Sequence, residues 1–399
     1  MPLELSTGSA GPHRCAGSRM TGKERGHAAL EGRPTDRFPV TAIYHQLVYD
    51  DHFSELTGEP GWRLQAWKHA DPDEHLRLYR RMVEAAPFEL LQPVSKAPSR
   101  RARDRLEFVE RDGRPCRHDR ETDTWVALVD PGGGRHVHVY HANEEERVRD
   151  RADIEREVTI PDPDAMIAEG ANDFLDAVMA VFGGHQFILS GGVVAPFYKC
   201  SHYVGLTNLY PLMLENPALL EALMDRLLEQ NLAEFHRLAA AGGDGMYIDD
   251  ATTTCDMISV EHYERFSMPY MQRMIDEVHC LGHKAIVIYF GGIADRLERI
   301  ASLGADGLVM ECSMKNYTND IEKTVGAIGD RVTLFSNIDP VGIVQDGTSS
   351  ALRAEIARQC EAGRKGRGFI VSPSSPITPA TPVSRMQEFI EVAKEEGRL

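Results

Sequence analysis

The chain between residues 244 and 382 repeats one pattern five times: a short apolar run ends abruptly in polar residues, and an amphipathic stretch follows. The apolar runs occupy residues 245–250, 285–291, 307–312, 332–339 and 368–375. Each is strand-sized and lacks polar alternation, which is typical of parallel strands buried on both faces. The stretches between them, residues 261–281, 293–303, 320–328 and 349–362, carry apolar residues near helical spacing. This alternation predicts right-handed crossovers and a (β/α)8 barrel.

Three runs upstream complete the predicted barrel. Residues 39–46, 88–92 and 186–191 are expected to form its first, second and third strands. The predicted fold class is α/β, a single (β/α)8 TIM barrel over residues 20–399 with a β-hairpin insertion after strand 2. Residues 1–19 lack apolar periodicity and are expected to be a disordered N-terminal tail, with Met20 as an alternative start.

The insertion, at about residues 95–161, is charged and rich in turn residues, which indicates hairpins. His136 and His138 share one face of an alternating run, and His141 follows it. A metal site is one interpretation of these histidines. A solvated hairpin face is the favoured interpretation.

Composition limits the classes of protein that this chain can represent. With 399 residues, 42% of them hydrophobic, it can bury a large core in one domain. The net charge of -17 argues against nucleic acid or an anionic membrane as a partner. No apolar run reaches the roughly 18 residues of a spanning helix. Seven cysteines without framework spacing predict reduced thiols and a cytoplasmic location.

Polar residues end the predicted strands, and in a parallel barrel these ends meet at one mouth. The residues expected to be catalytic are Asp249, Asp250, Glu311 and Tyr289. The residues expected to bind substrate are His45, Gln92, Ser190, Asn337, Asp339, Ser374 and Ser375. For any one of these residues, an ordinary loop cap is an equal alternative.

Asp249 and Asp250 are adjacent in a predicted strand, so their side chains point to opposite sides and only one is expected to face the barrel axis. If that one lies near Glu311, repulsion between the carboxylates raises one pKa and creates a proton donor. Cys312 and Glu311 are weak candidates for metal ligands. A small buried hydrophobe is an equal interpretation of the Cys312 thiol.

Several short segments resemble the uroporphyrinogen decarboxylase superfamily. Residues 21–40 hold an Arg-bearing stretch and then Asp-Arg-x-Pro-Val, which leads into the first predicted strand. Similar segments follow at residues 258–266, 268–270, 304–306, 329–331, 337–339 and 381–382. The resemblance covers nearly the whole chain from Met20 and implies a (β/α)8 barrel. It also implies one of two chemistries: cofactor-free decarboxylation of a porphyrinogen, or methyl transfer to or from a corrinoid or thiol, usually with zinc.

The decarboxylases of that superfamily carry an Arg-x-Ala-Gly-Arg segment after the first strand and an Asp at the end of the second. The corresponding residues here are 44–51, which include Asp50 and Asp51, and Gln92. The acidic pair would repel a polycarboxylate rather than hold it. Porphyrinogen decarboxylation is therefore not expected.

The zinc-bearing methyltransferases carry His-x-Cys-Gly at the end of the fifth strand and a further Cys at the end of the eighth. The matching positions here hold Ile288, Phe290 and Ser375, so the inherited zinc site is predicted to be absent. A relocated metal held by Glu311, Cys312, Asp249 and His45 stays open as an alternative. A metal-free site is slightly favoured.

The resulting hypothesis is a cytoplasmic methyltransferase-type enzyme, expected to be a homodimer, that moves a methyl group between a small-molecule substrate and a corrinoid or thiol. No Asp-x-His-x-x-Gly segment of a corrinoid-binding domain is present in the sequence. A corrinoid would therefore be supplied separately, free or on a corrinoid protein. The alternatives are a metal-independent decarboxylase or lyase with Asp249 or Glu311 as proton donor, and a binding protein without catalysis.

Overall fold

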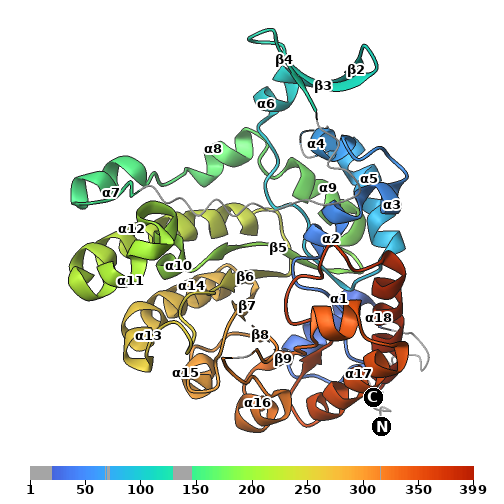
Figure 1. Ribbon diagram of the computed structural model, residues 1–399, viewed down its shortest axis with the longest axis vertical. Coiled ribbons are helices and arrows are strands. Elements are labelled where there is room, and N and C mark those ends of the chain that lie inside the picture. Colours follow the sequence, from blue (N-terminus) through green and yellow to red (C-terminus); the bar gives the residue numbers. More distant parts are fainter. Residues whose placement is uncertain (1–19, 68, 70–71, 129–145, 315) are drawn as a thin grey trace, which may run out of the picture.

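A curled parallel sheet forms the centre of the molecule in the computed structural model, which describes residues 20–67, 69, 72–128, 146–314 and 316–399 (Figure 1). Its seven strands lie in the order β1-β5-β6-β7-β8-β9-β10. Their bounds are β1 Leu90–Leu91, β5 Phe187–Val194, β6 Gly245–Asp249, β7 Lys284–Tyr289, β8 Gly307–Met310, β9 Thr333–Phe335 and β10 Phe369–Ile370. The five strands from β6 onward lie in the five apolar runs of the sequence, each with only one residue or none outside its run.

The first of the eight predicted strands is reduced to a short bridging segment. Val40 forms an isolated parallel bridge with Val371, directly after β10. On the other side, the backbone N–H of Glu89 donates to the Val40 carbonyl over 2.8 Å, directly before β1. The described sheet therefore has seven strands, and residues 39–41 occupy the place of the eighth between its two edge strands.

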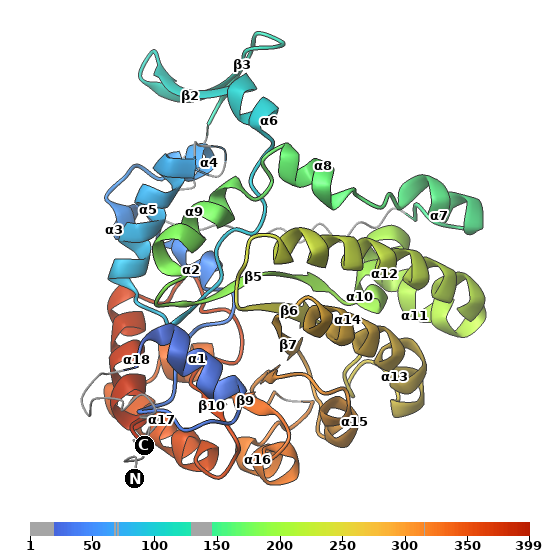
Figure 2. The same ribbon diagram turned by 180° about the vertical axis from the view of Figure 1, so that it is seen from behind.

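Helices lie around the outside of the curled sheet (Figures 1 and 2). In the first half they are α1 Gly22–Leu30, α2 His45–Asp51, α3 Phe53–Thr57, α4 Arg63–Trp67, α5 Pro72–Ala85, α6 Arg100–Arg105, α7 Arg151–Glu157, α8 Pro163–Ala168 and α9 Asp173–Phe182. In the second half they are α10 Pro196–Val204, α11 Leu206–Glu215, α12 Pro217–Ala239, α13 Val260–Phe266, α14 Met268–Cys280, α15 Leu297–Ser302, α16 Ile321–Ile328, the π-helix η1 Pro340–Gln345, α17 Ser349–Gly363 and α18 Val383–Glu396. None of the helices in the described ranges is long and apolar enough to cross a membrane.

Two similar Gly-x-Asp-Gly segments show how the sequence starts strands β6 and β8. Gly242 and Gly304 take the left-handed backbone conformation, with φ of 76° and 74°, that ends a preceding helical segment. Two residues later, Asp244 accepts the Ile188 N–H of β5, and Asp306 accepts the Ala285 N–H of β7. Each aspartate thus satisfies the backbone of the neighbouring strand at the amino end of the sheet.

Helix α1 closes the amino end of the curled sheet. Its Ala29 and Leu30 belong to the apolar cluster inside the sheet, which also holds Phe187, Ile286 and Phe335. Because this end is filled by a helix, a ligand can reach the inside of the sheet only at the carboxyl ends of the strands. Parallel barrels place their sites at that same end.

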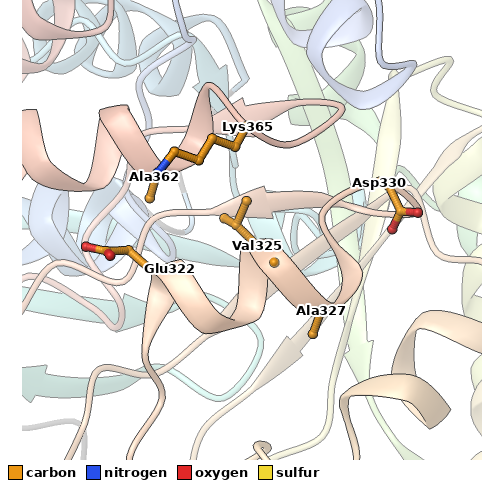
Figure 3. Close-up of a pocket in the computed structure, with 7 residues that line it drawn as sticks. Glu322, Val325, Ala327, Asp330, Ala362 and Lys365 are labelled. Carbon is orange, nitrogen blue, oxygen red and sulfur yellow. The ribbon is translucent and has the colours of Figure 1, made fainter.

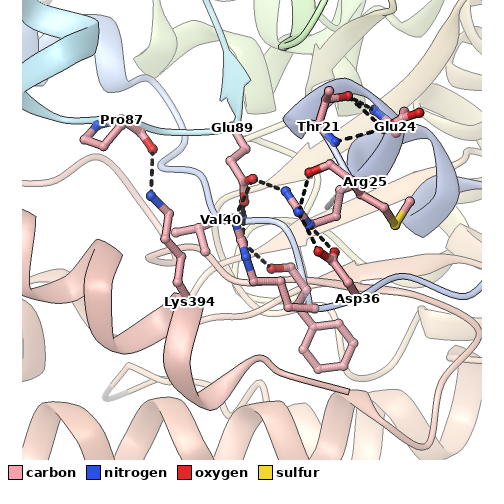
Figure 4. Close-up of polar contacts among 11 residues, drawn as sticks. Thr21, Glu24, Arg25, Asp36, Val40, Pro87, Glu89 and Lys394 are labelled. Carbon is pink, nitrogen blue, oxygen red and sulfur yellow. Dashed lines mark hydrogen bonds and ion pairs between the residues drawn. The ribbon is translucent and has the colours of Figure 1, made fainter. Parts of the chain in front are cut away.

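A buried ion network attaches α1 to the bridging segment and to β1 (Figure 4). Glu89 accepts from Arg25 and from both terminal nitrogens of Arg37, the latter at 2.6 and 2.8 Å. Arg25 also donates to Asp36 at 2.7 Å, and the Arg25 guanidinium helps to hold the pKa of that carboxyl below its usual value against the effect of burial. The Arg-bearing opening segment of the sequence therefore has a structural role at the seam of the sheet.

The region between β1 and β5 carries a separate antiparallel sheet. Its strands are β2 Leu106–Arg111, β3 Arg114–Asp119 and β4 Thr124–Ala127, and it projects from one end of the molecule (Figure 1). The histidines at 136, 138 and 141, with the alternating run that holds two of them, lie outside the described residues. So does the N-terminal segment 1–19 that was expected to be disordered.

Candidate active site

Asp249, the last residue of β6, lies at the carboxyl end of the sheet and faces its interior. Its Oδ2 accepts a hydrogen bond of 2.7 Å from the Tyr44 hydroxyl. Its Oδ1 has no hydrogen-bond partner in the described ranges, and only 7% of the residue is exposed. Burial raises the pKa of the Asp249 carboxyl to about 7, the Tyr44 hydroxyl lowers it, and the Asp250 charge raises it. At neutral pH this carboxyl is therefore poised between its acidic and ionised forms.

Tyr44 was not among the residues predicted from the sequence. It immediately precedes α2 and takes a left-handed backbone with φ of 54°, which is uncommon for a residue with a side chain. Its N–H donates to Gln92 Oε1 over 2.7 Å, and its hydroxyl reaches Asp249. The feature of the sequence that could have identified Tyr44 is its position shortly after the first strand segment, residues 39–41.

Three half-buried aromatic rings surround the region next to Asp249. The ring of Tyr44 lies edge-to-face with that of Tyr247, with centroids 5.5 Å apart, and tilted against that of Phe290 at 6.1 Å. All three pack on the interior apolar cluster, which also contains Ile288, the β7 residue paired with Asp249. The carboxyl therefore lies against an aromatic and aliphatic wall.

Asp250 points to the other side of the sheet, as the adjacency of the two aspartates required. It is fully buried and accepts from the hydroxyls of Thr253 and Ser267, both at 2.6 Å. Burial raises the pKa of Asp250, while the two hydroxyls lower it. Its contacts connect the loop after β6 to the segment between α13 and α14.

The loops after β8 and β9 are held together by amide side chains. Glu311 Oε2 accepts from the Tyr317 hydroxyl at 2.6 Å. The Glu311 carbonyl accepts from Asn337 at 3.3 Å and from Asn319 at 3.0 Å. Asn319, which sequence analysis missed, also donates to the Gly291 carbonyl after β7 at 2.9 Å. Asn337 and Asn319 therefore fix the positions of three neighbouring strand ends.

Cys312 lies near Ser374 and Asp339 at the same end of the sheet. Burial raises the pKa of its thiol, Ser374 lowers it, and the Asp339 and Glu311 carboxylates raise it. Asp339 caps η1 by accepting from the N–H groups of Val341 and Gly342. Ser374 is fully buried, whereas Ser375 is half-buried. A thiol with a raised pKa is a weak nucleophile at neutral pH.

Two predicted residues lie away from the interior of the sheet at the carboxyl ends of its strands. Tyr289 is fully buried and pairs its hydroxyl with that of Tyr263 on α13 at 2.8 Å, outside the sheet. Ser190 lies at a register shift inside β5, which continues to Val194. The third strand therefore does not end where the sequence predicted, and Ser190 is not at a strand end.

His45 begins α2 instead of ending a strand, and it is fully buried. Its Nε2 accepts the Gln92 N–H over 3.1 Å, and burial lowers the pKa of the imidazole to about 3. His45 is therefore neutral and positions the chain after β1. Gln92 in turn holds Tyr44.

At two positions where the resemblance to the superfamily implies zinc ligands, the side chains present do not fit zinc. Ile288 and Phe290 carry no ligand atoms, and both belong to or pack on the interior apolar cluster. His45 uses Nε2 in the bond to Gln92, and Glu311 is engaged by Tyr317. The described residues contain no group of three or more His, Cys, Asp or Glu side chains arranged for a metal ion.

A surface cavity of about 340 Å³ lies between α16 and α17, away from this end of the sheet (Figure 3). Glu322, Val325 and Ala327 of α16 and Ala362 and Lys365 near the end of α17 line it. None of the predicted site residues contributes to that cavity.

A curled parallel sheet that is surrounded by helices defines an α/β protein of the barrel class. A family described as "Uroporphyrinogen decarboxylase (URO-D)" matches residues 141–396. This chain therefore belongs to the uroporphyrinogen decarboxylase family.

Individual relatives divide between two activities. A uroporphyrinogen decarboxylase of Methylococcus capsulatus is 26% identical over 62% of this chain and 70% of its own length. A methylcobamide:CoM methyltransferase, MtbA, of Methanosarcina acetivorans is 23% identical over 53% of this chain. This chain spans only 59% of that methyltransferase. A solved methyltransferase from Methanosarcina mazei shares the fold over 94% of this chain, with a TM-score of 0.67 and 18% identity.

Proposed function

We propose that this chain is a methyltransferase-type member of its family, which moves a methyl group between a small substrate and a corrinoid or thiol acceptor. The observation that carries the proposal is the Asp249 site: one buried carboxyl on an aromatic wall, without a basic side chain among the groups that perturb its pKa. A porphyrinogen has many carboxylates, and such a site offers them no cation. The MtbA relatives, whose name pairs methylcobamide with CoM, support a corrinoid as one partner in the transfer.

The chain's own residues have distinct tasks in this proposal. Tyr44 orients the Asp249 carboxyl through its hydroxyl, and Gln92 holds Tyr44 by accepting its N–H. The wall of Tyr247, Ile288 and Phe290 excludes water, which strengthens the electrostatic effect of the carboxyl on a bound methyl donor. A corrinoid or thiol acceptor would approach from the open end of the sheet and supply the electron pair for the new bond to carbon.

The test is incubation of the protein with reduced cobalamin and a panel of methylated amines, sulfonium compounds, methoxy and methylthio compounds. Formation of methylated cobalamin, followed by absorbance, supports the proposal. A parallel reaction with a thiol acceptor is followed by mass spectrometry. Absence of methyl transfer to either acceptor across the whole panel would overturn it.

One observation favours a second function, a metal-independent decarboxylase or lyase. A carboxyl with a pKa of about 7 can donate a proton at neutral pH, as protonation of a carbanion requires. Release of carbon dioxide from a carboxylated substrate, resistant to chelators and lost in Asp249→Asn, would support this function. The Glu311 carboxylate is a weaker candidate for the donor, because Tyr317 occupies it.

A further inference from the structure

The Asp249 site combines a buried carboxyl with aromatic faces, and no basic side chain of the described residues is among the groups that shift the carboxyl's pKa. Oδ1 has no hydrogen-bond partner in the described part of the chain, and 93% of the residue is buried. The groups that perturb its pKa are Tyr44 and Asp250, and neither is cationic. Ionising such a carboxyl is costly unless a positive charge comes to it.

The neighbouring rings are arranged to receive that charge. Tyr44, Tyr247 and Phe290 are each half-buried, and the ring of Tyr44 contacts both of the others. Aromatic faces attract cations that have no N–H donors, and quaternary ammonium groups are bound in this way in aromatic cages. A primary ammonium or a metal ion would need several oxygen acceptors, whereas this wall offers chiefly carbon.

We infer that this site binds a small onium cation, a methylated ammonium or sulfonium compound, with the charged centre against Tyr44, Tyr247 and Phe290 and over the free oxygen of Asp249. Phe290 and Ile288 lie at positions where the resemblance to the superfamily implies zinc ligands. Their side chains offer an aromatic and an aliphatic face there, which suit an organic cation better than a metal ion.

The onium class also explains how methyl transfer proceeds without a Lewis acid on the donor. The bond from the methyl carbon to nitrogen or sulfur breaks, and its electron pair remains on that atom, which leaves as a neutral amine or thioether. The acceptor, a reduced corrinoid or a thiolate, supplies the electron pair of the new bond to the methyl carbon. This catalytic step rests on the proposed function, whereas the binding of the cation does not.

The inference can be tested by isothermal titration calorimetry with two ligands. One is choline, and the other is its neutral carbon isostere, in which a tert-butyl group replaces trimethylammonium. The two ligands have the same shape, so their difference isolates the charge. We expect choline to bind at least about tenfold more tightly than the isostere, since each cation–π contact contributes a small favourable increment. Tetramethylammonium and trimethylsulfonium, which lack the alcohol, should compete with choline.

Variants locate the site. Asp249→Asn should weaken choline about ten- to a hundredfold and leave the isostere unchanged, and Phe290→Leu should weaken choline about fivefold or more. Tyr270→Phe is the matched control, because its hydroxyl contacts Asp225 on the outer helices. Choline affinity should also rise between about pH 6 and pH 8 as Asp249 ionises, and this rise should vanish in Asp249→Asn.

Three results would overturn the inference. They are equal affinities for choline and the isostere, absence of binding by every onium probe, and choline binding that survives both Asp249→Asn and Phe290→Leu. Selective onium binding without methyl transfer to any acceptor would instead contradict the proposed function and leave the cation site standing. Methyl transfer only from uncharged methoxy donors, without binding of any onium probe, would contradict the cation site and leave the proposed function standing.

Discussion

Replacing Asp249 by Asn should stabilise the fold, and the gain should grow with pH. The carboxyl has a pKa of about 7 in the folded chain against an ordinary value of 3.8. The stability contributed by its protonated form is complete below about pH 4 and is lost as pH rises to about 7, because the unfolded carboxyl ionises first. The loss amounts to roughly 4 kcal/mol above pH 7, at about 1.4 kcal/mol for each unit.

Asn keeps the shape of Asp and can still accept from the Tyr44 hydroxyl, so the variant removes only the ionisation. The unfolding free energy of Asp249→Asn should therefore exceed that of the natural chain by about 2 kcal/mol at pH 5 and about 4 kcal/mol at pH 8. Urea titrations of both proteins at the two pH values measure the difference. Asp330→Asn, an exposed change on the outer shell, is the control. A difference that stays constant between the two pH values would refute this account of Asp249.

Three further changes test other parts of the structure. Glu89→Gln leaves the buried guanidiniums of Arg25 and Arg37 without their carboxylate and should cost about 3–5 kcal/mol in urea unfolding; a cost below about 1 kcal/mol would contradict the role of this network. Tyr44→Phe removes the hydroxyl that lowers the pKa of the buried β6 aspartate, so the pH midpoint of choline binding should move upward; a downward shift would count against the hydrogen bond. Asp306→Ala leaves the Ala285 N–H of β7 without its side-chain acceptor and should cost about 1–3 kcal/mol, measured by denaturant unfolding, and an unchanged midpoint would show that water replaces the carboxylate there.

The sequence predicted the strands from β6 onward because each is an uninterrupted apolar run bounded by polar residues. It was wrong at the end of β5, which was predicted at residue 191. The structure continues that strand to Val194, because Gly191 and Gly192 allow Ser95 and Tyr247 to approach the backbone closely. The first strand was predicted too long because a left-handed residue, Tyr44, starts α2 immediately after it.

The candidate site was predictable in part. The alternation of side chains along a strand correctly predicted that Asp249 and Asp250 point to opposite sides of the sheet. The sequence did not show which of the two faces inward, because that depends on the register between β6 and β7. Tyr44 could not be identified as a neighbour of Asp249 from spacing, because the two residues are 205 positions apart in the sequence. Asn319 was missed because its side chain bonds two loop carbonyls and one loop N–H, which leaves no local pattern in the sequence.

Transfer of a labelled methyl group tests the central claim most directly. The reaction contains chelator-treated protein, reduced cobalamin and a sulfonium or quaternary ammonium donor that carries a carbon-13 methyl group. Nuclear magnetic resonance follows the position of the label. The account predicts that the label leaves the donor and appears on the corrinoid, and that the rate falls in Asp249→Asn and Phe290→Leu. Label that stays on every onium donor, or that moves only after zinc is restored, would contradict a metal-free methyl transfer at Asp249.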